Sequence, residues 1–181
     1  MQKNITLGVS GAIGASNICD YCIFLSTKYT VNVIMTENAK KFVSRDVLKC
    51  YVEKVYVDFD DSTSGVLHAE LAKVTDLLIM IPATANTISK IAHGIADNLL
   101  TTTALIYDKK ILFAPNMNIN IWKNPIVQNS VQLLKNYGHE FINTTKMSYA
   151  ACEKKFIEID CALPTPKELL EIISNYFSNE G

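Results

Sequence analysis

The sequence has no long hydrophobic run and no excess of charge of either sign. No stretch approaches the roughly 18 to 20 consecutive apolar residues of a bilayer span, and the short apolar run near the N-terminus soon meets glycines. The net charge is -1, with acidic and basic residues interspersed, so the surface lacks the field that gathers nucleic acid or anionic lipid. We therefore expect no nucleic acid and no membrane among its partners, and a cytoplasmic protein.

Cysteine is sparse as well. The five cysteines are odd in number and scattered, unlike the dense framework of a small secreted domain, so reduced thiols are expected. Cys19 and Cys22 form a C-x-x-C pair, but Ile18 and Tyr21 beside them are also apolar, which favours buried helix packing over a redox or metal role. We expect no metal site, and the ordinary globular composition predicts a single domain over residues 1–181.

Short apolar runs alternate with segments of helical periodicity along most of the chain. The apolar runs are ITLGVS, VNVIM, KVYVDF, LLIMIPA and KILFAPN. Continuous apolar strands between helices are typical of a parallel sheet covered on both faces. We therefore predict a three-layer α/β fold with a doubly wound parallel sheet, of the Rossmann or flavodoxin type. The predicted helices cover residues 16–28, 37–42, 68–75, 86–93, 98–107 and 120–137.

The C-terminal part contains one clear helix and one irregular segment. Thr165 is placed to cap the final helix, Pro166 stands at its first position, and Glu168 is placed to close a capping box. The segment over residues 144–164 has mixed periodicity, so we expect a loop there. Within it, residues 147–161 are predicted to form a mobile flap.

Ligands bind outside the carboxyl ends of the strands in a doubly wound sheet, and four polar clusters fall at such ends. The first is SGAIG, from Ser10 to Gly14, where glycines and a helix N-terminus suit a phosphate. A simple tight turn remains an alternative there, because the full G-x-G-x-x-G spacing is absent. The second contains Thr36 and Glu37; taken alone, Thr36 is better explained as a helix cap than as a phosphate ligand.

The third cluster contains Thr84, Asn86 and Thr87, followed one helix later by Asp97, Asn98, Thr101 and Thr102. A strand-to-helix turn needs at most one cap residue, so this surplus predicts a ligand with several hydrogen-bonding edges.

The fourth cluster contains three asparagines, at 116, 118 and 120, around Met117 and the single tryptophan, Trp122. Asparagines are common turn formers, but with a methionine and the sole tryptophan beside them we expect the lip of a pocket.

Three motifs together indicate a family. Residues 82–87 read PATANT, residues 115–122 read PNMNINIW, and His68 precedes the fourth predicted strand. These resemble the P-A-S-A-N-T motif, the P-x-M-N-x-x-M-W motif and the histidine of the homo-oligomeric flavin-containing cysteine decarboxylases. The likeness covers nearly the whole chain. Ile121 replaces the second methionine of the motif, which is a nearly volume-conserving change.

The family has two relevant branches. One decarboxylates phosphopantothenoylcysteine in coenzyme A synthesis, and the other oxidatively decarboxylates the C-terminal cysteine of lantibiotic precursor peptides. The segments NLLTT and PNMNI resemble the second, epidermin-type branch. The segment AACEKKF stands where the first branch has an A-C-G-x-x-G-x-G-R clamp, and Cys152 stands where that branch keeps its reducing cysteine.

The resemblance implies a flavoprotein that binds FMN, with the phosphate at Gly11 to Ile13 and at Thr36. The flavin ring would lie against the PATANT and ADNLLTT segments. The implied cofactor-binding residues are Gly11, Ala12, Ile13, Thr36, Ala83, Thr84, Ala85, Asn86, Thr87, Asp97, Thr101 and Met117. The implied substrate-binding residues are Met117, Asn118, Trp122 and Cys152.

The same resemblance implies an activity and an assembly. His68 would act as the acid and base, and Asn118 would hold the substrate carboxylate. The expected reaction is oxidative decarboxylation of a peptide's C-terminal cysteine to an aminoenethiol. Phosphopantothenoylcysteine decarboxylation is the alternative within the family, and a non-catalytic flavin-binding regulatory protein is the alternative of another class. A homotrimer that assembles into a homododecamer is expected, with the flavin at the subunit boundary.

Overall fold

The structure is a computed structural model that describes residues 2–57, 66–150 and 154–179. Its centre is a six-stranded sheet in the order β3-β2-β1-β4-β5-β6, with every neighbouring pair parallel. This confirms the predicted doubly wound sheet. The strands are β1 (Asn4–Val9), β2 (Thr30–Met35), β3 (Lys54–Tyr56), β4 (Leu77–Ala83), β5 (Ile111–Pro115) and β6 (Glu140–Phe141).

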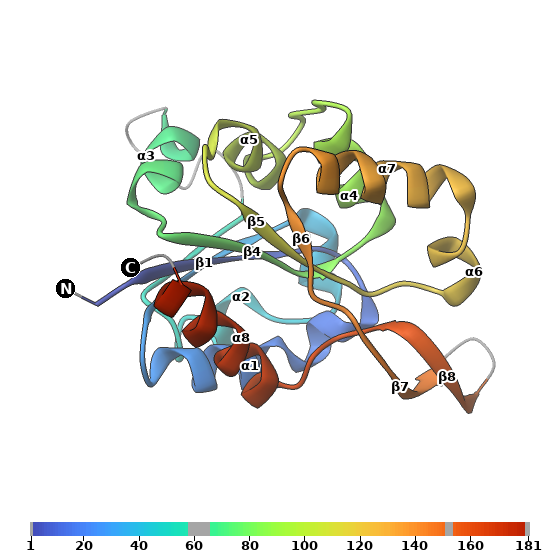
Figure 1. The fold of residues 1–181 in the computed structure, drawn as a ribbon. Helices are drawn as coiled ribbons and strands as arrows, with labels where there is room; N and C mark the ends of the chain where they lie inside the picture. The colour runs from blue at the N-terminus through green and yellow to red at the C-terminus, as the bar shows by residue number, and fades with distance from the viewer. Residues whose placement is uncertain (1, 58–65, 151–153, 180–181) are drawn as a thin grey trace.

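Helices cover both faces of the sheet, as Figure 1 shows. One face carries α1 (Ile18–Ser26), α2 (Arg45–Leu48) and α8 (Pro166–Asn179), with the short 3-10 helices η1 (Ile13–Asn17) and η2 (Glu37–Lys41). The other face carries α3 (Leu67–Val74), α4 (Ala85–Ala92), α5 (Leu99–Ile106) and α7 (Pro125–Asn136).

The strands divide the core into two layers because successive side chains point to opposite faces. In β4, Leu77 and Ile79 pack into the layer that contains Leu169 of α8, whereas Met80 packs into the layer that contains Leu100 of α5. All seven residues of β4 are buried. Full burial of a Leu, Ile or Met side chain contributes about 1.5 to 3 kcal/mol to the stability of the fold. This two-sided burial explains why the strand reads as a continuous apolar run.

The single helix predicted over residues 120–137 is wrong, because the structure has two helices there. A four-residue helix α6 (Ile119–Trp122) ends before Asn124, and α7 begins at Pro125. The Asn124 side chain accepts a hydrogen bond from the Ile126 backbone N–H at 2.9 Å. Proline lacks the N–H that a continuing helix would need and suits the first helical position, so the Asn-Pro pair starts a new helix.

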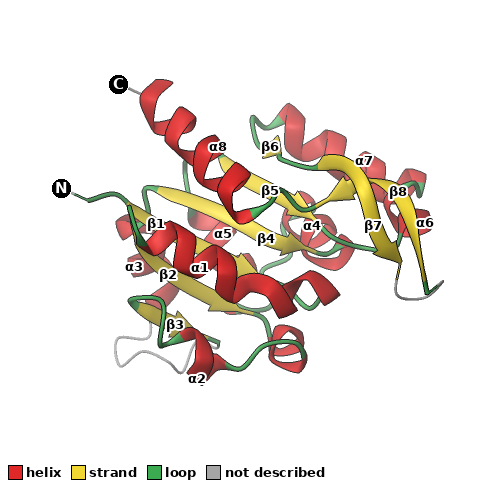
Figure 2. Cartoon of the chain, turned by 90° about the horizontal axis from the view of Figure 1, so that it is seen from below, coloured by secondary structure: helices red, strands yellow, loops and turns green. Residues whose placement is uncertain are grey.

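The irregular loop expected over residues 144–164 is also wrong for the described residues. They form an antiparallel hairpin of β7 (Thr144–Ala150) and β8 (Lys155–Ala162). Figure 2 shows the hairpin projecting beyond the carboxyl ends of the sheet strands. Burial alternates along β7, so the hairpin has an inner and an outer face. Cys152 lies outside the described residues, and the mobility of the flap stays a prediction.

Two smaller predictions are confirmed. The Glu168 backbone N–H donates to the Thr165 hydroxyl at 3.2 Å, and the Thr165 N–H donates to the Glu168 carboxylate at 2.6 Å, which completes the capping box of α8. Cys22 is fully buried in α1, and burial raises the pKa of its thiol to about 12, as expected for packing rather than thiolate chemistry. Within the described ranges, no helix is long and apolar enough to cross a bilayer.

Candidate functional site

A cavity of about 730 Å³ lies at the carboxyl ends of β1, β4 and β5. The chain leaves β1 toward β2 and β3 but returns to place β4 on the other side of β1. The cavity is therefore at the point where the strand order reverses, which is the usual ligand position in such sheets. Its walls are the loop after β1, the start of α4, the loop after β5 and the hairpin.

Hydrogen bonds join the loops that form this edge. The Ser10 hydroxyl donates to the Pro82 carbonyl at 2.6 Å and accepts from the Thr84 N–H at 2.9 Å, which connects the ends of β1 and β4. The Gly14 N–H donates to the Asn116 side-chain oxygen at 3.0 Å, which connects the loops after β1 and β5. Three loops far apart in sequence are thus held together before any ligand binds.

Gly11 of the first cluster is required by the chain's own packing, and Gly14 lies tightly against two side chains from distant segments. A Cβ at Gly11 would lie 2.6 Å from the Cβ of Asn38, and a Cβ at Gly14 would lie 2.7 Å from Leu163 Cδ1. The sequence interpretation instead gave these glycines to an approaching anion. The loop still lines the cavity through Gly11, Ala12 and Ile13, and the first N–H groups of η1 have no acceptor within the helix.

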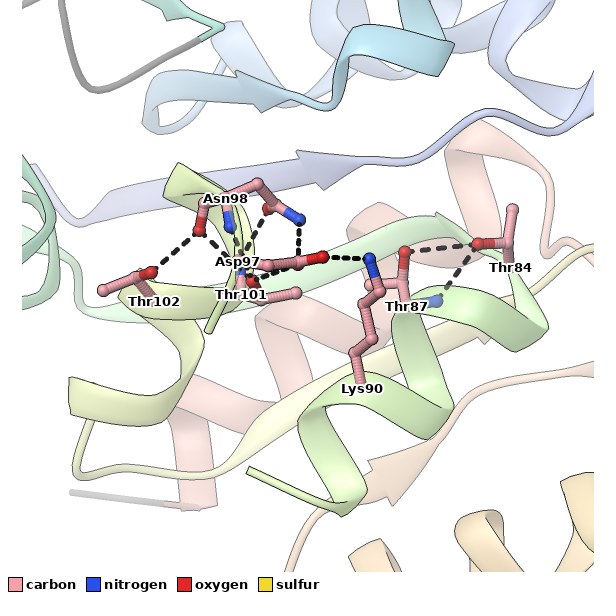
Figure 3. Close-up of polar contacts among 7 residues, drawn as sticks. All are labelled: Thr84, Thr87, Lys90, Asp97, Asn98, Thr101 and Thr102. Atoms are coloured by element: carbon pink, nitrogen blue, oxygen red, sulfur yellow. Dashed lines mark hydrogen bonds and ion pairs between the residues drawn. The ribbon is translucent and has the colours of Figure 1, made fainter. Parts of the chain in front are cut away.

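The third cluster is occupied mainly with helix capping (Figure 3). The Thr84 hydroxyl caps α4 by accepting from the Thr87 N–H at 3.3 Å. Asn98 and Thr101 form a reciprocal capping box at the start of α5. Both helices that the sequence predicts in this stretch are capped by side chains of the cluster, and this capping uses most of the polar groups that the sequence interpretation assigned to a ligand.

Asp97 in the same cluster forms an ion pair with Lys90 (Figure 3). The hydrogen bond from Lys90 lowers the pKa of the Asp97 carboxyl. Of the third cluster and its neighbours, Thr84, Ala85 and Asn86 line the cavity of this chain. The residues Thr87, Asp97 and Thr101 do not line it, and their contact with a flavin stays a prediction.

The fourth cluster lies where it was expected, with two exceptions, Trp122 and the exposed Asn120, which do not line the cavity. Asn116, Met117 and Asn118 line the cavity, and the Asn118 side-chain oxygen caps α6 by accepting from the Asn120 N–H at 2.8 Å. Trp122 is only 7% exposed and belongs to the core layer. The expected position of Trp122 at the pocket lip is thus corrected to a core position, because the last turn of α6 points its ring inward.

Three further residues singled out in the sequence lie off the cavity wall of this chain. Thr36 caps η2 by accepting a hydrogen bond from the Ala39 N–H at 3.3 Å. This is the helix-cap role that the sequence favoured for Thr36 when taken alone. Ala83 is the fully buried last residue of β4. His68 is half-buried in the first turn of α3. This helix packs against α5, on the face of the sheet that also carries α4 and α7.

Sequence reasoning missed the inner face of the hairpin. This face adds to the cavity wall the side chains of Lys146, Ser148, Ile157 and Ile159. The alternation of residue types in TTKMSYA and KFIEIDCA was the available signal, since a period of two indicates a strand with two unlike faces. The pairing of Lys146 with Ile159 and of Ser148 with Ile157 brings the four side chains together.

These residues fit FMN. The cavity volume lies within the range of roughly 300 to 1,000 Å³ of small-molecule sites. In the loop over residues 11–14, the N–H groups of Ala12 and Gly14 already donate to the Ser10 carbonyl and to Asn116, so the backbone N–H groups of Gly11 and Ile13 are the ones suited to a phosphate. Asn86 and Asn116 offer amides, and Met117 and Ile159 offer apolar contact for a flat ring.

Comparison with known proteins gives a consistent result. The family model described as Flavoprotein matches residues 1–178. A probable phosphopantothenoylcysteine decarboxylase of Streptococcus mutans is 39% identical over 158 residues, which cover 84% of this chain and 88% of that protein. The epidermin decarboxylase of Staphylococcus epidermidis is 36% identical over 137 residues, which cover 75% of each protein.

Solved structures show the same two activities. The peptidyl-cysteine decarboxylase EpiD in complex with the substrate peptide DSYTC has 29% identity and a TM-score of 0.87, over 97% of this chain and 100% of that one. A phosphopantothenoylcysteine decarboxylase variant has 26% identity and a TM-score of 0.88, over 98% and 100%. The FMN-binding protein AtHal3 has 26% identity and a TM-score of 0.86, with both chains fully covered.

FMN is therefore the cofactor, and the cavity at the point where the strand order reverses is its candidate site. The chain belongs to the Flavoprotein family, among its flavin-dependent cysteine decarboxylases.

Proposed function

We propose that this protein oxidatively decarboxylates the C-terminal cysteine of a lantibiotic precursor peptide and releases an aminoenethiol. The observation that carries the proposal is the hairpin. Its inner face brings Ile157 and Ile159 to the cavity, and β7 and β8 pair from Ala150–Lys155 down to Thr144–Ala162. A wall of paired strands that is apolar on the β8 side and polar on the β7 side, where Lys146 and Ser148 lie, suits the side chains and the charged end of an extended peptide.

Asn118 is suited to hold the substrate carboxylate. Its side-chain oxygen is engaged by the Asn120 N–H at 2.8 Å, so the NH₂ group is the part that remains to donate to a ligand in the cavity. The cap thereby fixes the side chain before substrate arrives. Bound FMN would supply the two-electron acceptor that the oxidation needs.

His68 would serve as the acid and base from a neighbouring copy of the chain. The residue does not line the cavity of its own chain, yet the reaction needs a proton acceptor near the cysteine. An imidazole ring can both accept and donate a proton, which suits that task. We propose that trimers, assembled into a dodecamer, bring His68 of one copy to the flavin of the next.

The direct test is the mass of the product. The purified FMN-loaded protein is incubated with a synthetic peptide that ends in cysteine, and with a control peptide that ends in serine. The expected product of the first has lost CO₂ and two hydrogens, and the second is unchanged. An unmodified cysteine peptide, under conditions in which the flavin stays bound, would refute the proposed activity.

Decarboxylation of phosphopantothenoylcysteine is the second candidate. It is supported by the Streptococcus mutans relative at 39% identity and by the cation that Lys146 brings to the cavity. The same assay distinguishes it, because this substrate would lose CO₂ alone and the cysteine peptide would remain intact.

A further inference from the structure

Lys146 is the one charged side chain among the described residues that line the cavity. It lies on the inner face of β7, directly across from Ile159 of β8. No carboxylate of the described part of the chain forms an ion pair with it within 4.0 Å. Among the described residues, the cavity wall thus has a single formal charge, and that charge is positive.

The ammonium group of Lys146 is held in place by the main chain. It donates a hydrogen bond to the carbonyl of Leu163, and Leu163 in turn lies against Gly14, where an added Cβ would meet its Cδ1 at 2.7 Å. Lys146 therefore fixes the end of the hairpin beside the loop that follows β1. One of its three N–H donors is used by the carbonyl, and an ammonium group can make further hydrogen bonds.

Glu168 is the carboxylate that faces this region. Lys146 contributes to the lowered pKa of Glu168, but the larger cause is the backbone hydrogen bond from Thr165. That bond, at 2.6 Å, commits the carboxylate to the cap of α8. Since Glu168 is exposed and beyond ion-pair distance, it leaves most of the Lys146 charge uncompensated on the cavity side.

We infer that Lys146 is the anion-selecting residue of this cavity and binds an oxyanion group of the bound ligand. The inference rests on the proposed function for the identity of the substrate. With the proposed peptide substrate, two sources of the oxyanion have the required chemistry, namely the phosphate of FMN and the carboxylate of the cysteine peptide. A charge-assisted hydrogen bond of this kind corresponds to roughly a 10-fold to 100-fold change in affinity.

The test compares Lys146→Met with Lys146→Arg in two binding measurements that do not use turnover. In the first, FMN-loaded protein is exchanged against FMN or riboflavin, and the dissociation constants are obtained from flavin fluorescence. In the second, a cysteine-terminated peptide and its C-terminal amide are titrated into FMN-loaded protein that also carries His68→Asn. Lys155→Met is the matched control, because Lys155 lies on the same hairpin but does not line the cavity.

A loss of affinity for FMN without a loss for riboflavin assigns Lys146 to the phosphate. A loss for the free-acid peptide without a loss for its amide assigns it to the carboxylate. In either case Lys146→Arg retains most of the affinity and Lys155→Met has little effect. Equal losses for the charged and neutral ligand of each pair, or no loss for any of them, would overturn the inference.

The test of Lys146 remains decisive if the first variant does not fold or if the proposed reaction fails. If Lys146→Met does not fold, Lys146→Gln keeps a donor for the Leu163 carbonyl and is measured in its place. If the cysteine peptide binds without losing CO₂ and hydrogen in the wild-type protein, the proposed reaction fails, but the FMN and riboflavin comparison still decides the role of Lys146.

Discussion

The backbone N–H of Gly14 donates a hydrogen bond to the side-chain oxygen of Asn116 at 3.0 Å, and so joins the loops after β1 and β5 at the cavity. The Asn116 N–H in turn donates to the Ala83 carbonyl at the end of β4. One asparagine therefore connects the carboxyl ends of three strands.

Asn116→Ala is expected to lower the free energy of unfolding by about 1 kcal/mol, since a part-buried N–H loses its acceptor. It should also weaken FMN binding, because the two loops are no longer held together. Urea unfolding and flavin titration measure the two effects. Asn136→Ala, which removes an exposed helical partner of Gln132, is the control. Unchanged flavin affinity in Asn116→Ala would show that the connection does not shape the site.

Asn118→Asp separates the capping role of this residue from its proposed role in substrate binding. The carboxylate still accepts from the Asn120 N–H, so α6 keeps its cap. The NH₂ donor is replaced by a negative oxygen that repels a substrate carboxylate. We expect near wild-type stability and bound flavin, with CO₂ release from the cysteine peptide lower by about 100-fold or more. Retained activity would remove Asn118 from carboxylate binding.

His68 gives a test of the proposed subunit boundary. His68→Asn and Asn118→Asp should each be inactive while folded and flavin-bound. If His68 of one copy serves the cavity of the next, mixed oligomers reassembled from the two inactive variants contain some cavities with both residues intact. Mass spectrometry of the peptide product should then show partial recovery. If verified mixed oligomers recover no activity, the shared site is contradicted. A flavin-loaded monomer in light scattering would contradict it as well.

The fold was predictable to a large extent because its signals are local. The run LLIMIPA is buried on both faces in β4, and Thr165 with Glu168 forms the capping box that the spacing indicates. These features depend on residues within a few positions of each other. The break between α6 and α7 at Asn124 and Pro125 is also a local feature. It was missed because the apolar periodicity continues across the two helices.

The site was less predictable because its walls come from distant segments. The glycine at position 14 is explained by Leu163 and Asn116, which lie more than a hundred residues away. The alternation along each strand indicates two unlike faces, but which face lines the cavity depends on the pairing of β7 with β8 and on their place beside distant loops. Trp122 was misplaced since sequence alone does not tell which side of a four-residue helix faces the core.

His139 predicts a pH dependence of stability. Its Nδ1 accepts a hydrogen bond from the Ile111 N–H at 3.2 Å, and burial lowers the pKa of the imidazole in the folded state. Between the folded and unfolded pKa values the unfolded chain binds more protons, so stability rises with pH in that window. The contribution is fully present above the unfolded value of about 6.5 and is lost as the pH falls through the folded pKa.

The measurement is urea unfolding from about pH 7.5 down to about pH 5. The wild-type protein should lose stability over this range, and His139→Gln should show a smaller loss because the titrating group is gone. His93→Gln is the control, since that ring is exposed and its Nδ1 is hydrogen-bonded to the Ser89 carbonyl of its own helix. Parallel pH profiles for wild type and His139→Gln would exclude His139 as the source.

The hairpin is expected to close over a bound peptide. Its inner face lines the cavity through Ser148 and Ile157, so a peptide in the cavity contacts β7 and β8 together and stabilises their pairing. A shield at this position would also keep water from a reactive thioaldehyde.

Trypsin cleavage after Lys154 or Lys155 measures the closure of the hairpin, because both lysines lie at the tip-side end of β8. In FMN-loaded His68→Asn protein, saturating cysteine peptide should slow cleavage there while cleavage after Lys49 at the end of α2 continues unchanged. Equal cleavage with and without peptide, or no cleavage at the tip in either state, would show that the hairpin is a fixed wall of the cavity. Peptide entry would then depend on the loops after β1 and β5.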